Sequence, residues 1–339
     1  MRRRSRGAVT VLVGLAAALV AGVPGLGAPA AVPSGEITLY TSESEDDVNA
    51  LVQDFTRRTP GVRVQIFRAG SGPVVSKLQA ELQAGRIQAD VIWFADIDFF
   101  RSLAGRDLLL PYRPPAGARV PAPYHYEGDR MHEVRLIFNV VAFNTNHVRF
   151  RPSSWWDLTL PRYRGRVGMP SPFVSGAAFN HVGTFASLRE FGWDYYRKLR
   201  DNGAVVLRSN GDVAQKLASG EVSIAQIVDF FVRNLKREGS PVDHIWPREG
   251  ALLVPTPVAI IKTTGNVPAA QAFVNYLYTP EAQRLFVQRS YIPVVPGIPY
   301  PEGVPDISEL RVLHPNLAYI DRHREEIRRI FGELFGVTR

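Results

Sequence analysis

The residues best suited to bind a ligand in this sequence are small polar ones that stand directly before predicted helices. They lie in three loops: Ser42 and Ser44; Ser71 and Gly72; and Ser175, Gly176 and Ala177. A helix N-terminus offers backbone N–H groups without intrahelical acceptors and a partial positive charge, and serine hydroxyls add further donors. These loops predict a site for an anion such as a phosphate, phosphonate or carboxylate. The competing interpretation is that each serine only caps its own helix.

Charged and amide side chains follow other predicted strands. Asp229 ends one strand, and its carboxylate would either accept from an ammonium or hydroxyl of a ligand or cap the helix that follows. Arg208 and Asn210 follow another strand, where Arg208 would either pair with an anion through two hydrogen bonds or be solvated. Arg135 carries the same ambiguity.

Catalytic motifs are absent from the sequence. The seven histidines show no His-Glu-x-x-His spacing, and there is no Gly-x-Ser-x-Gly, no Gly-Lys-Ser/Thr loop and no cysteine. Glu43 and Glu45 lie near Ser42, but acidic residues at a helix start explain them. We therefore predict a protein that is not an enzyme and uses no cofactor or metal. A secreted hydrolase with Glu43 or Asp229 as general base is a distant alternative.

Strands alternate with helices in the first part of the chain. Apolar, β-prone runs at Ile37–Tyr40, Val62–Phe67 and Asp90–Phe94 are separated by segments with helical periodicity. This order predicts an α/β fold with a mostly parallel sheet. The long apolar run Val134–Asn144 then predicts a crossing into a second lobe.

The same alternation resumes after that crossing, and the run Val254–Ile261 predicts the return. Two lobes joined by two hinge crossings create a cleft at the carboxyl ends of their strands, where open α/β sheets bind ligands. We predict lobe 1 at residues 33–133 plus 256–290, lobe 2 at 134–255, and a C-terminal helical segment at 291–339 that packs on the lobes.

The first 30 residues predict a secretory signal peptide. A run of arginines precedes the apolar stretch Ala8–Val23, and Ala28-Pro29-Ala30 has small residues at a cleavage spacing. An uncleaved membrane anchor is the alternative, but glycine and proline interrupt the stretch from Gly22 onward. Without the four leader arginines the formal charge falls from +8 to +4, which does not favour a nucleic-acid partner. A chain without cysteine carries no N-terminal lipid, so we expect a soluble protein in the periplasm.

These motifs, in this order, resemble the extracellular solute-binding proteins of ABC importers. They are the strand at Ile37–Tyr40, the turn Ala69–Gly72, the strand Ala89–Phe94, Phe143-Asn144-Thr145 after the crossing, and Ala218–Gln226 before the return. The nearest branch contains ferric-iron, thiamine, 2-aminoethylphosphonate and sugar-phosphate binders. The resemblance implies a two-lobed type II periplasmic binding fold, a monomer that closes by hinge motion on a small solute and delivers it to an ABC permease.

The resemblance fails where a ferric site would lie. Ferric binders of this branch place a histidine after the first strand and a Tyr-Tyr pair after the strand that follows the Gly-Glu turn. Here Ser44 stands near the first position and Asp229-Phe230-Phe231 at the second. Phenylalanine has no phenolate oxygen, so we predict an anionic solute such as a phosphonate or phosphate ester. Ferric iron and thiamine stay open as alternatives. Tyr195-Tyr196 fits core packing better than metal binding.

Overall fold

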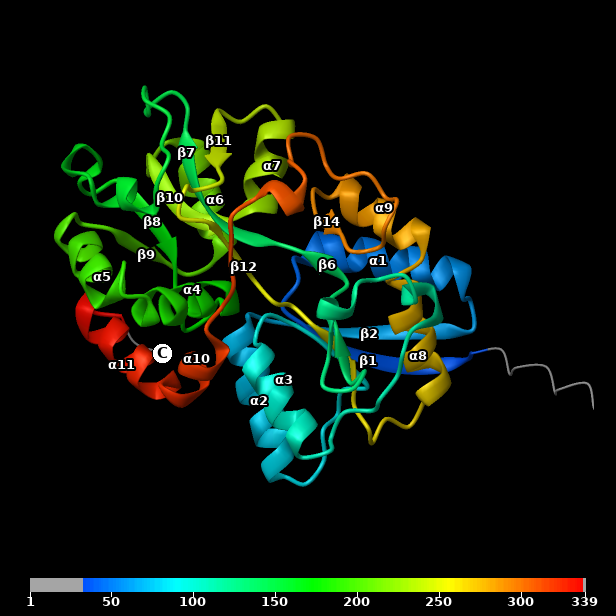
Figure 1. Ribbon diagram of the computed structural model, residues 1–339. Helices are drawn as coiled ribbons and strands as arrows, with labels where there is room; N and C mark the ends of the chain where they lie inside the picture. The colour runs from blue at the N-terminus through cyan, green and yellow to red at the C-terminus, as the bar shows by residue number, and fades with distance from the viewer. Residues whose placement is uncertain (1–32, 338–339) are drawn as a thin grey trace, which may run out of the picture. The chain divides into compact units, whose positions relative to one another are not determined.

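Two sheets lie side by side in the computed structural model, which describes residues 33–337 (Figure 1). The predicted signal peptide lies outside the described residues. No helix within the described part of the chain is long and apolar enough to cross a membrane.

Lobe 1 is built on a six-stranded sheet. Its order is β2 (Val62–Arg68), β1 (Gly35–Thr41), β3 (Val91–Trp93), β13 (Val258–Ile260), β5 (Met131–His132) and β4 (His125–Tyr126). The first three strands are parallel, and β13 joins β3 in antiparallel orientation. The helices of this lobe are α1 (Glu45–Arg58), α2 (Ser71–Gln83), α3 (Ile97–Gly105), α8 (Val267–Tyr276) and α9 (Pro280–Gln288).

Lobe 2 is built on a seven-stranded mixed sheet. Six strands run in the order β15 (Val312–Leu313), β12 (Ala251–Leu253), β7 (Phe138–Asn144), β10 (Ile224–Val228), β8 (Val167–Pro170) and β9 (Val205–Leu207), while β11 (Val242–Ile245) pairs with β7. Its helices are α4 (Gly176–Ser187), α5 (Gly192–Asp201), α6 (Asn210–Ser219), α7 (Asp229–Arg237), α10 (Leu317–Arg322) and α11 (Arg324–Phe335).

The chain passes between the lobes in both predicted places. The run from Val134 splits into a short strand, β6 (Arg135–Leu136), and the long central strand β7 of lobe 2. The return passes through Thr256 to β13. A third passage, which the sequence pattern does not reveal, leads from β14 (Ile292–Pro293), paired with β6, to β15 in lobe 2. The exact lobe boundaries stay a prediction.

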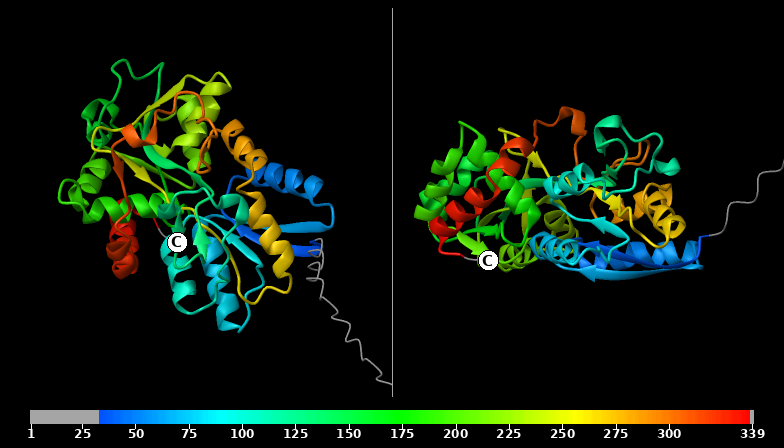
Figure 2. Two further views of the ribbon diagram at one scale, coloured as in Figure 1. Left: turned by 45° about the vertical axis from the view of Figure 1, so that its right-hand side comes forward. Right: turned by 90° about the horizontal axis from the view of Figure 1, so that it is seen from below.

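The C-terminal helices bridge the two lobes. Helices α10 and α11 pack on α4, and α11 also contacts α5, whereas α10 reaches α3 of lobe 1. The two further views place these helices beside the second sheet (Figure 2). The α/β architecture with two lobes agrees with the sequence prediction.

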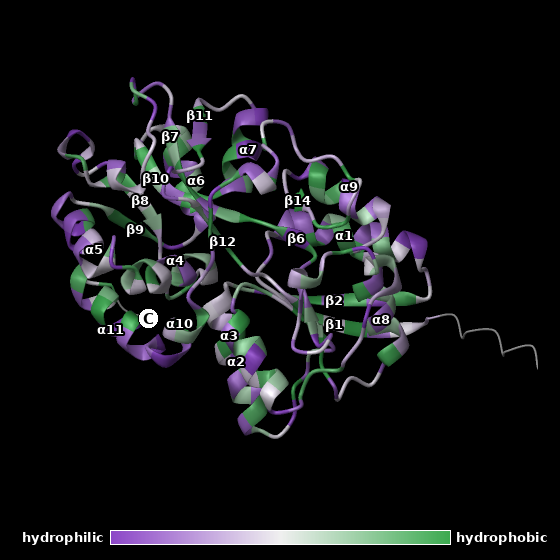
Figure 3. Cartoon of the chain, viewed as in Figure 1, coloured by the Kyte–Doolittle hydropathy of each residue, from purple (hydrophilic) through white to green (hydrophobic). Residues whose placement is uncertain are grey.

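Buried apolar strands hold each lobe together. Residues of β1 and β7 such as Leu39, Val140 and Val141 are fully buried, and these strands are coloured as hydrophobic in Figure 3. Helices cover them with one apolar face; α1, for example, buries Val48, Leu51 and Phe55. Rigid lobes of this kind leave the loops at the strand ends free to form a site.

Candidate ligand-binding pocket

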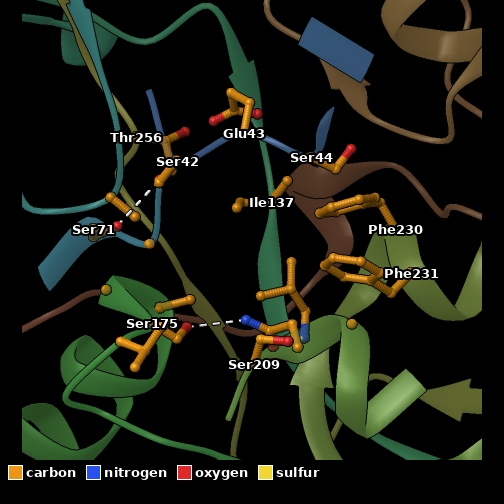
Figure 4. A pocket seen from close by; sticks show the side chains of 18 of the residues that line it. Ser42, Glu43, Ser44, Ser71, Ile137, Ser175, Ser209, Phe230, Phe231 and Thr256 are labelled. Carbon is orange, nitrogen blue, oxygen red and sulfur yellow. Dashed lines mark hydrogen bonds between the residues drawn. The ribbon is translucent and has the colours of Figure 1, made fainter. Parts of the chain in front are cut away.

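A pocket of about 180 Å³ lies between the lobes and is lined by residues of both. Ser42 and Ser71 of lobe 1 face Ser175 and Ser209 of lobe 2, and the rings of Phe230 and Phe231 stand at one side (Figure 4). The pocket lies at the ends of strands β1, β3 and β10, as expected for an open α/β sheet.

Five helices begin at this pocket. The N-cap residues of α1, α2, α4, α6 and α7 are Ser44, Gly70, Ser175, Ser209 and Val228, and all five line it. The first N–H groups of each helix have no acceptor inside the helix, and the aligned peptide dipoles place partial positive charge there. Two of the helices come from lobe 1 and three from lobe 2, so the pocket gathers donors from both.

The serines also hold the pocket loops in place. The Ser42 hydroxyl accepts a hydrogen bond from Ser71 at 3.1 Å, which joins the loops before α1 and α2. Ser175 accepts from the backbone N–H of Ala178 and from the Asn210 side chain at 3.0 Å. Capping and lining the pocket are therefore not alternatives, because Ser175 does both.

A buried ion pair forms one end of the pocket. The Arg135 guanidinium contacts the Glu43 carboxylate and donates to the Thr256 hydroxyl at 2.7 Å, and the Arg135 and Glu43 side chains are only 2% and 4% exposed. Burial raises the pKa of Glu43 above its ordinary value, although Arg135 opposes the shift. Burial alone would lower the pKa of Arg135, but Glu43, Tyr291 and Glu133 together outweigh it and the net shift is upward. A second cation, Arg68, donates to the Glu43 carbonyl oxygen at 3.0 Å.

Apolar side chains also line the pocket. They are Ile137, Val174, Phe230 and Phe231, and the two phenylalanine rings lie 4.3 Å apart between centroids. Phe230 also packs on Tyr291 at 4.3 Å. The pocket thus offers both polar donors and aromatic surface.

Glycines let the two lobes approach at the pocket. A Cβ added to Gly176 of α4 would lie 1.7 Å from the carbonyl oxygen of Ala95 in lobe 1, and one added to Gly70 would lie 2.6 Å from Val174. Across the same seam the Gly72 N–H lies 3.4 Å from the Val174 carbonyl oxygen. Only glycine permits such backbone contact. Because the backbones of the two lobes meet at this seam, the structure represents a closed arrangement of the lobes.

Seven of the ten predicted ligand-binding residues line the pocket: Ser42, Ser44, Ser71, Ser175, Gly176, Ala177 and Asn210.

The structure places the other three elsewhere. Gly72 lies at the seam between the lobes, where an added Cβ would meet the Phe173 carbonyl oxygen at 2.2 Å. The Arg208 side chain is 80% exposed and pairs with Asp212. Asp229 is fully buried; it accepts from the Phe138 N–H at 3.0 Å and pairs with Arg233 at 2.8 Å. Its carboxylate is used inside the protein and does not line the pocket.

Sequence reasoning missed several residues that line the pocket, among them Arg68, Ser209, Gly211 and Thr256. Ser209 had a detectable signal, because it precedes a helical segment with Asp212 in its first turn. Tyr195 and Tyr196 are buried in the core of lobe 2, where the Tyr196 hydroxyl contacts His181 Nδ1 at 2.9 Å. The prediction of core packing for this pair is confirmed.

A two-lobed α/β fold with a pocket between the lobes is typical of solute-binding proteins. Residues 87–321 match the model of the bacterial extracellular solute-binding protein family, and the chain belongs to this family. Members of the family are solute-binding proteins and not enzymes, and the chain is thus the substrate-binding component of an ABC importer.

The chain is similar to several known proteins. A Haemophilus influenzae protein described as uncharacterized is 27% identical over 267 residues, covering 74% of this chain and 75% of the relative. The major ferric iron-binding protein of Neisseria meningitidis is 24% identical over 303 residues, covering 84% and 86%. Among solved structures, the periplasmic binding protein AfuA from Actinobacillus pleuropneumoniae, with exogenous fructose-6-phosphate bound, has a TM-score of 0.79 at 21% identity, covering 89% of this chain and 99% of AfuA.

Proposed function

We propose that this protein captures a small phosphorylated or phosphonated solute between its lobes and delivers it to an ABC permease, acting as a periplasmic monomer after removal of residues 1–30. The observation that carries the proposal is the convergence of five helix N-termini from both lobes on one pocket. An anion placed there meets backbone donors on several sides.

The fixed charges of the pocket point the same way. Arg68 and Arg135 bring two positive charges, and Glu43 brings one carboxylate whose pKa burial raises. The balance is positive even with Glu43 ionised. Because Glu43 is already paired with Arg135, the charge left for a ligand is mainly that of Arg68 and the helix termini.

The energy of such contacts suffices for a transport protein. Each helix terminus contributes about 0.3–1 kcal/mol to an anion at a surface and up to ~2 kcal/mol when partly buried. Five termini and one arginine therefore approach the ~8 kcal/mol that micromolar binding requires.

The pocket also limits the size of the solute. The pocket, of about 180 Å³, is small and is bounded by both lobes. A phosphate group with a short carbon skeleton fits this space, with the skeleton against Phe230 and Phe231. The sugar phosphate bound by AfuA belongs to the proposed ligand class.

The proposal is tested by ligand-dependent melting. We expect fructose-6-phosphate or 2-aminoethylphosphonate to raise the melting temperature, and fructose to leave it unchanged. Mass spectrometry of the solute that co-purifies from the native host would name the ligand. A flat response to every phosphorylated compound, or an equal response to the neutral sugar, would refute an anion site.

Two arginine variants make the test specific. Arg68→Gln removes a cation that lines the pocket and should weaken phosphate-ester binding at least about tenfold, since a charge-assisted hydrogen bond contributes about 1.5–3 kcal/mol. Arg208→Gln is the matched control, because Arg208 also follows a strand but lies outside the pocket. Equal affinities for the two variants in calorimetry would count against the proposed charge contact.

Ferric iron is the second candidate, favoured by the similarity to the Neisseria protein. Among the described residues, no tyrosine or histidine lines the pocket, and its carboxylate is paired with Arg135. We therefore expect no visible charge-transfer band when Fe(III) is added with an accompanying anion. A coloured complex would reverse the order of the two candidates.

A further inference from the structure

A hairpin at the edge of lobe 1 gathers three side chains that bind metals in other proteins. Strands β4 and β5 pair His125 directly with His132, and Asp129 lies in the turn between them. One ligand atom from each residue lies within 4.8 Å of those of the other two. None of the three lines the pocket between the lobes.

The two imidazole rings face each other through the same nitrogen. His125 Nδ1 and His132 Nδ1 are 2.6 Å apart. The Nε2 of His132 lies 2.8 Å from the Tyr112 carbonyl oxygen, so this nitrogen carries the proton and the neutral ring presents a lone pair at Nδ1. A backbone carbonyl on the far nitrogen is the usual outer partner of a metal-bound histidine.

The contact between the rings then requires a proton on His125 Nδ1, which donates to the lone pair of His132 Nδ1. For a metal to bind, this proton must move to Nε2 of the His125 ring, so that both Nδ1 atoms present lone pairs.

The turn holds the carboxylate near the rings. Glu127, Gly128 and Asp129 all have left-handed backbone conformations, with φ of 51°, 65° and 60°. The carbonyl oxygen of Asp129 accepts from the Tyr112 N–H at 2.8 Å, so the backbone of Tyr112 positions both Asp129 and His132. The Asp129 carboxylate pairs with Arg113 at 2.9 Å, and both side chains are about two-fifths exposed. An exposed pair of this kind contributes little and is easily exchanged.

We propose that His125 Nδ1, His132 Nδ1 and the Asp129 carboxylate form a binding site for a divalent transition-metal ion such as Zn²⁺. Two imidazoles and one carboxylate suit zinc, with a water as the fourth ligand. Zinc–nitrogen distances of ~2.0–2.1 Å in a tetrahedral site place the two nitrogens about 3.3 Å apart, so the rings must separate by about 0.7 Å from their 2.6 Å contact. A short hairpin at the sheet edge allows such a shift.

The position of this site suggests what the metal does. His132 pairs in register with Val258 of β13, two residues after Thr256. Three residues after His132 the chain reaches Arg135, which donates to the Thr256 hydroxyl. Both predicted crossings between the lobes therefore leave lobe 1 beside the hairpin. A metal there stabilises the base of both crossings in a chain that has no disulfide.

The test is Zn²⁺ binding by the full-length protein after treatment with EDTA. We expect one Zn²⁺ per chain in calorimetry and a higher melting temperature with Zn²⁺. His125→Asn should lower the affinity at least tenfold. His314→Asn, a change at an exposed histidine outside the hairpin, is the matched control.

A gain of affinity separates a metal site from a structural His–His hydrogen bond. Arg113→Gln frees the Asp129 carboxylate from its cation and should tighten Zn²⁺ binding severalfold, and the partial exposure of Arg113 makes this variant tolerable for folding. Substitution of Co²⁺ should give the visible absorption of a tetrahedral complex in the wild type. Failure of the wild type to bind either ion, or equal Zn²⁺ affinity in His125→Asn, would overturn the proposal. Neither result depends on the solute in the pocket.

Discussion

Substitution of Gly176 by alanine tests whether the lobes close on the solute. Gly176 is the first residue of α4, and its backbone conformation is one that alanine also adopts. The folded lobe should therefore tolerate the change. In the closed arrangement, however, the new Cβ would lie 1.7 Å from the Ala95 carbonyl oxygen and 2.9 Å from Ser71 Oγ.

The size of the effect follows from these distances. Real Cβ atoms essentially never approach a heavy atom closer than 3.0 Å, so the lobes must separate by about 1.3 Å at this point (3.0 minus 1.7). A shift of that size lengthens hydrogen bonds from the opposite lobe beyond useful reach. Loss of two such bonds, at about 1.5 kcal/mol each, corresponds to an affinity reduced about 100-fold.

The matched control is Gly211→Ala in α6. Gly211 also lines the pocket, but a Cβ there would meet only Ser209 Oγ, at an ordinary 3.6 Å. Calorimetry with the bound solute and small-angle X-ray scattering with and without it should show weak binding and incomplete closure for Gly176→Ala alone. Wild-type affinity and wild-type compaction in Gly176→Ala would refute the account of closure.

Two further predictions concern the contact between α11 and α3. Arg324 forms two hydrogen bonds to Asp96 at 2.7–2.8 Å across the lobes. Arg324→Gln should therefore favour the open form by about 1–2 kcal/mol, which scattering would show. The same change should weaken solute binding about five- to thirtyfold in calorimetry. Burial, then the Asp96 charge, raises the pKa of Asp98 to about 7, with Asp321 adding to the shift and Arg324 and Arg101 opposing it. A raised carboxyl pKa contributes stability below pH 3.8, and this stability is lost as the pH rises through about 7. Asp98→Asn should therefore raise the free energy of unfolding by roughly 2–4 kcal/mol at pH 8 and change it little at pH 4. Denaturant unfolding at the two pH values measures this difference.

Local sequence signals predicted the parts of the site that depend on local structure. Serines before helical segments identified three of the five helix N-termini, because a cap and its helix lie within a few residues of each other. The order of strands and helices likewise predicted the α/β fold. The loops converge because the strands before them end at the same cleft.

Long-range partners determined which expected residues do not line the pocket. Asp229 lies between Val228 and Phe230, which do line it, but its carboxylate accepts from the N–H of Phe138 in β7, 91 residues earlier in the chain. A local signal was nevertheless available, since Asp229 and Arg233, like Arg208 and Asp212, stand four residues apart with opposite charge on a helical segment or at its start. Such a partner indicates that a charge is already used within the protein.

The third passage between the lobes also escaped prediction. The segment from β14 to β15 shows no helical or strand periodicity in its sequence. The pairing of Val312 with Ala251 forms only when the rest of the second sheet is in place. The helical end of the predicted C-terminal segment is divided at His323 into α10 and α11. This passage matters for function because it carries Arg324 to the seam.

Because both lobes contribute hydrogen-bond donors to the pocket, the affinity for the solute depends on closure of the lobes. Lobe 1 contributes Ser42, Ser71 and Arg68, while lobe 2 contributes the N-termini of α4, α6 and α7. An anion held by one lobe alone leaves the donors of the other in water and gains roughly half of the available contacts. The closed form is favoured only by the contacts that the ligand makes in it and not in the open form. Changes at the seam that never touch the solute must therefore alter its affinity, and a solute too short to reach both lobes must bind weakly however well it fits one of them.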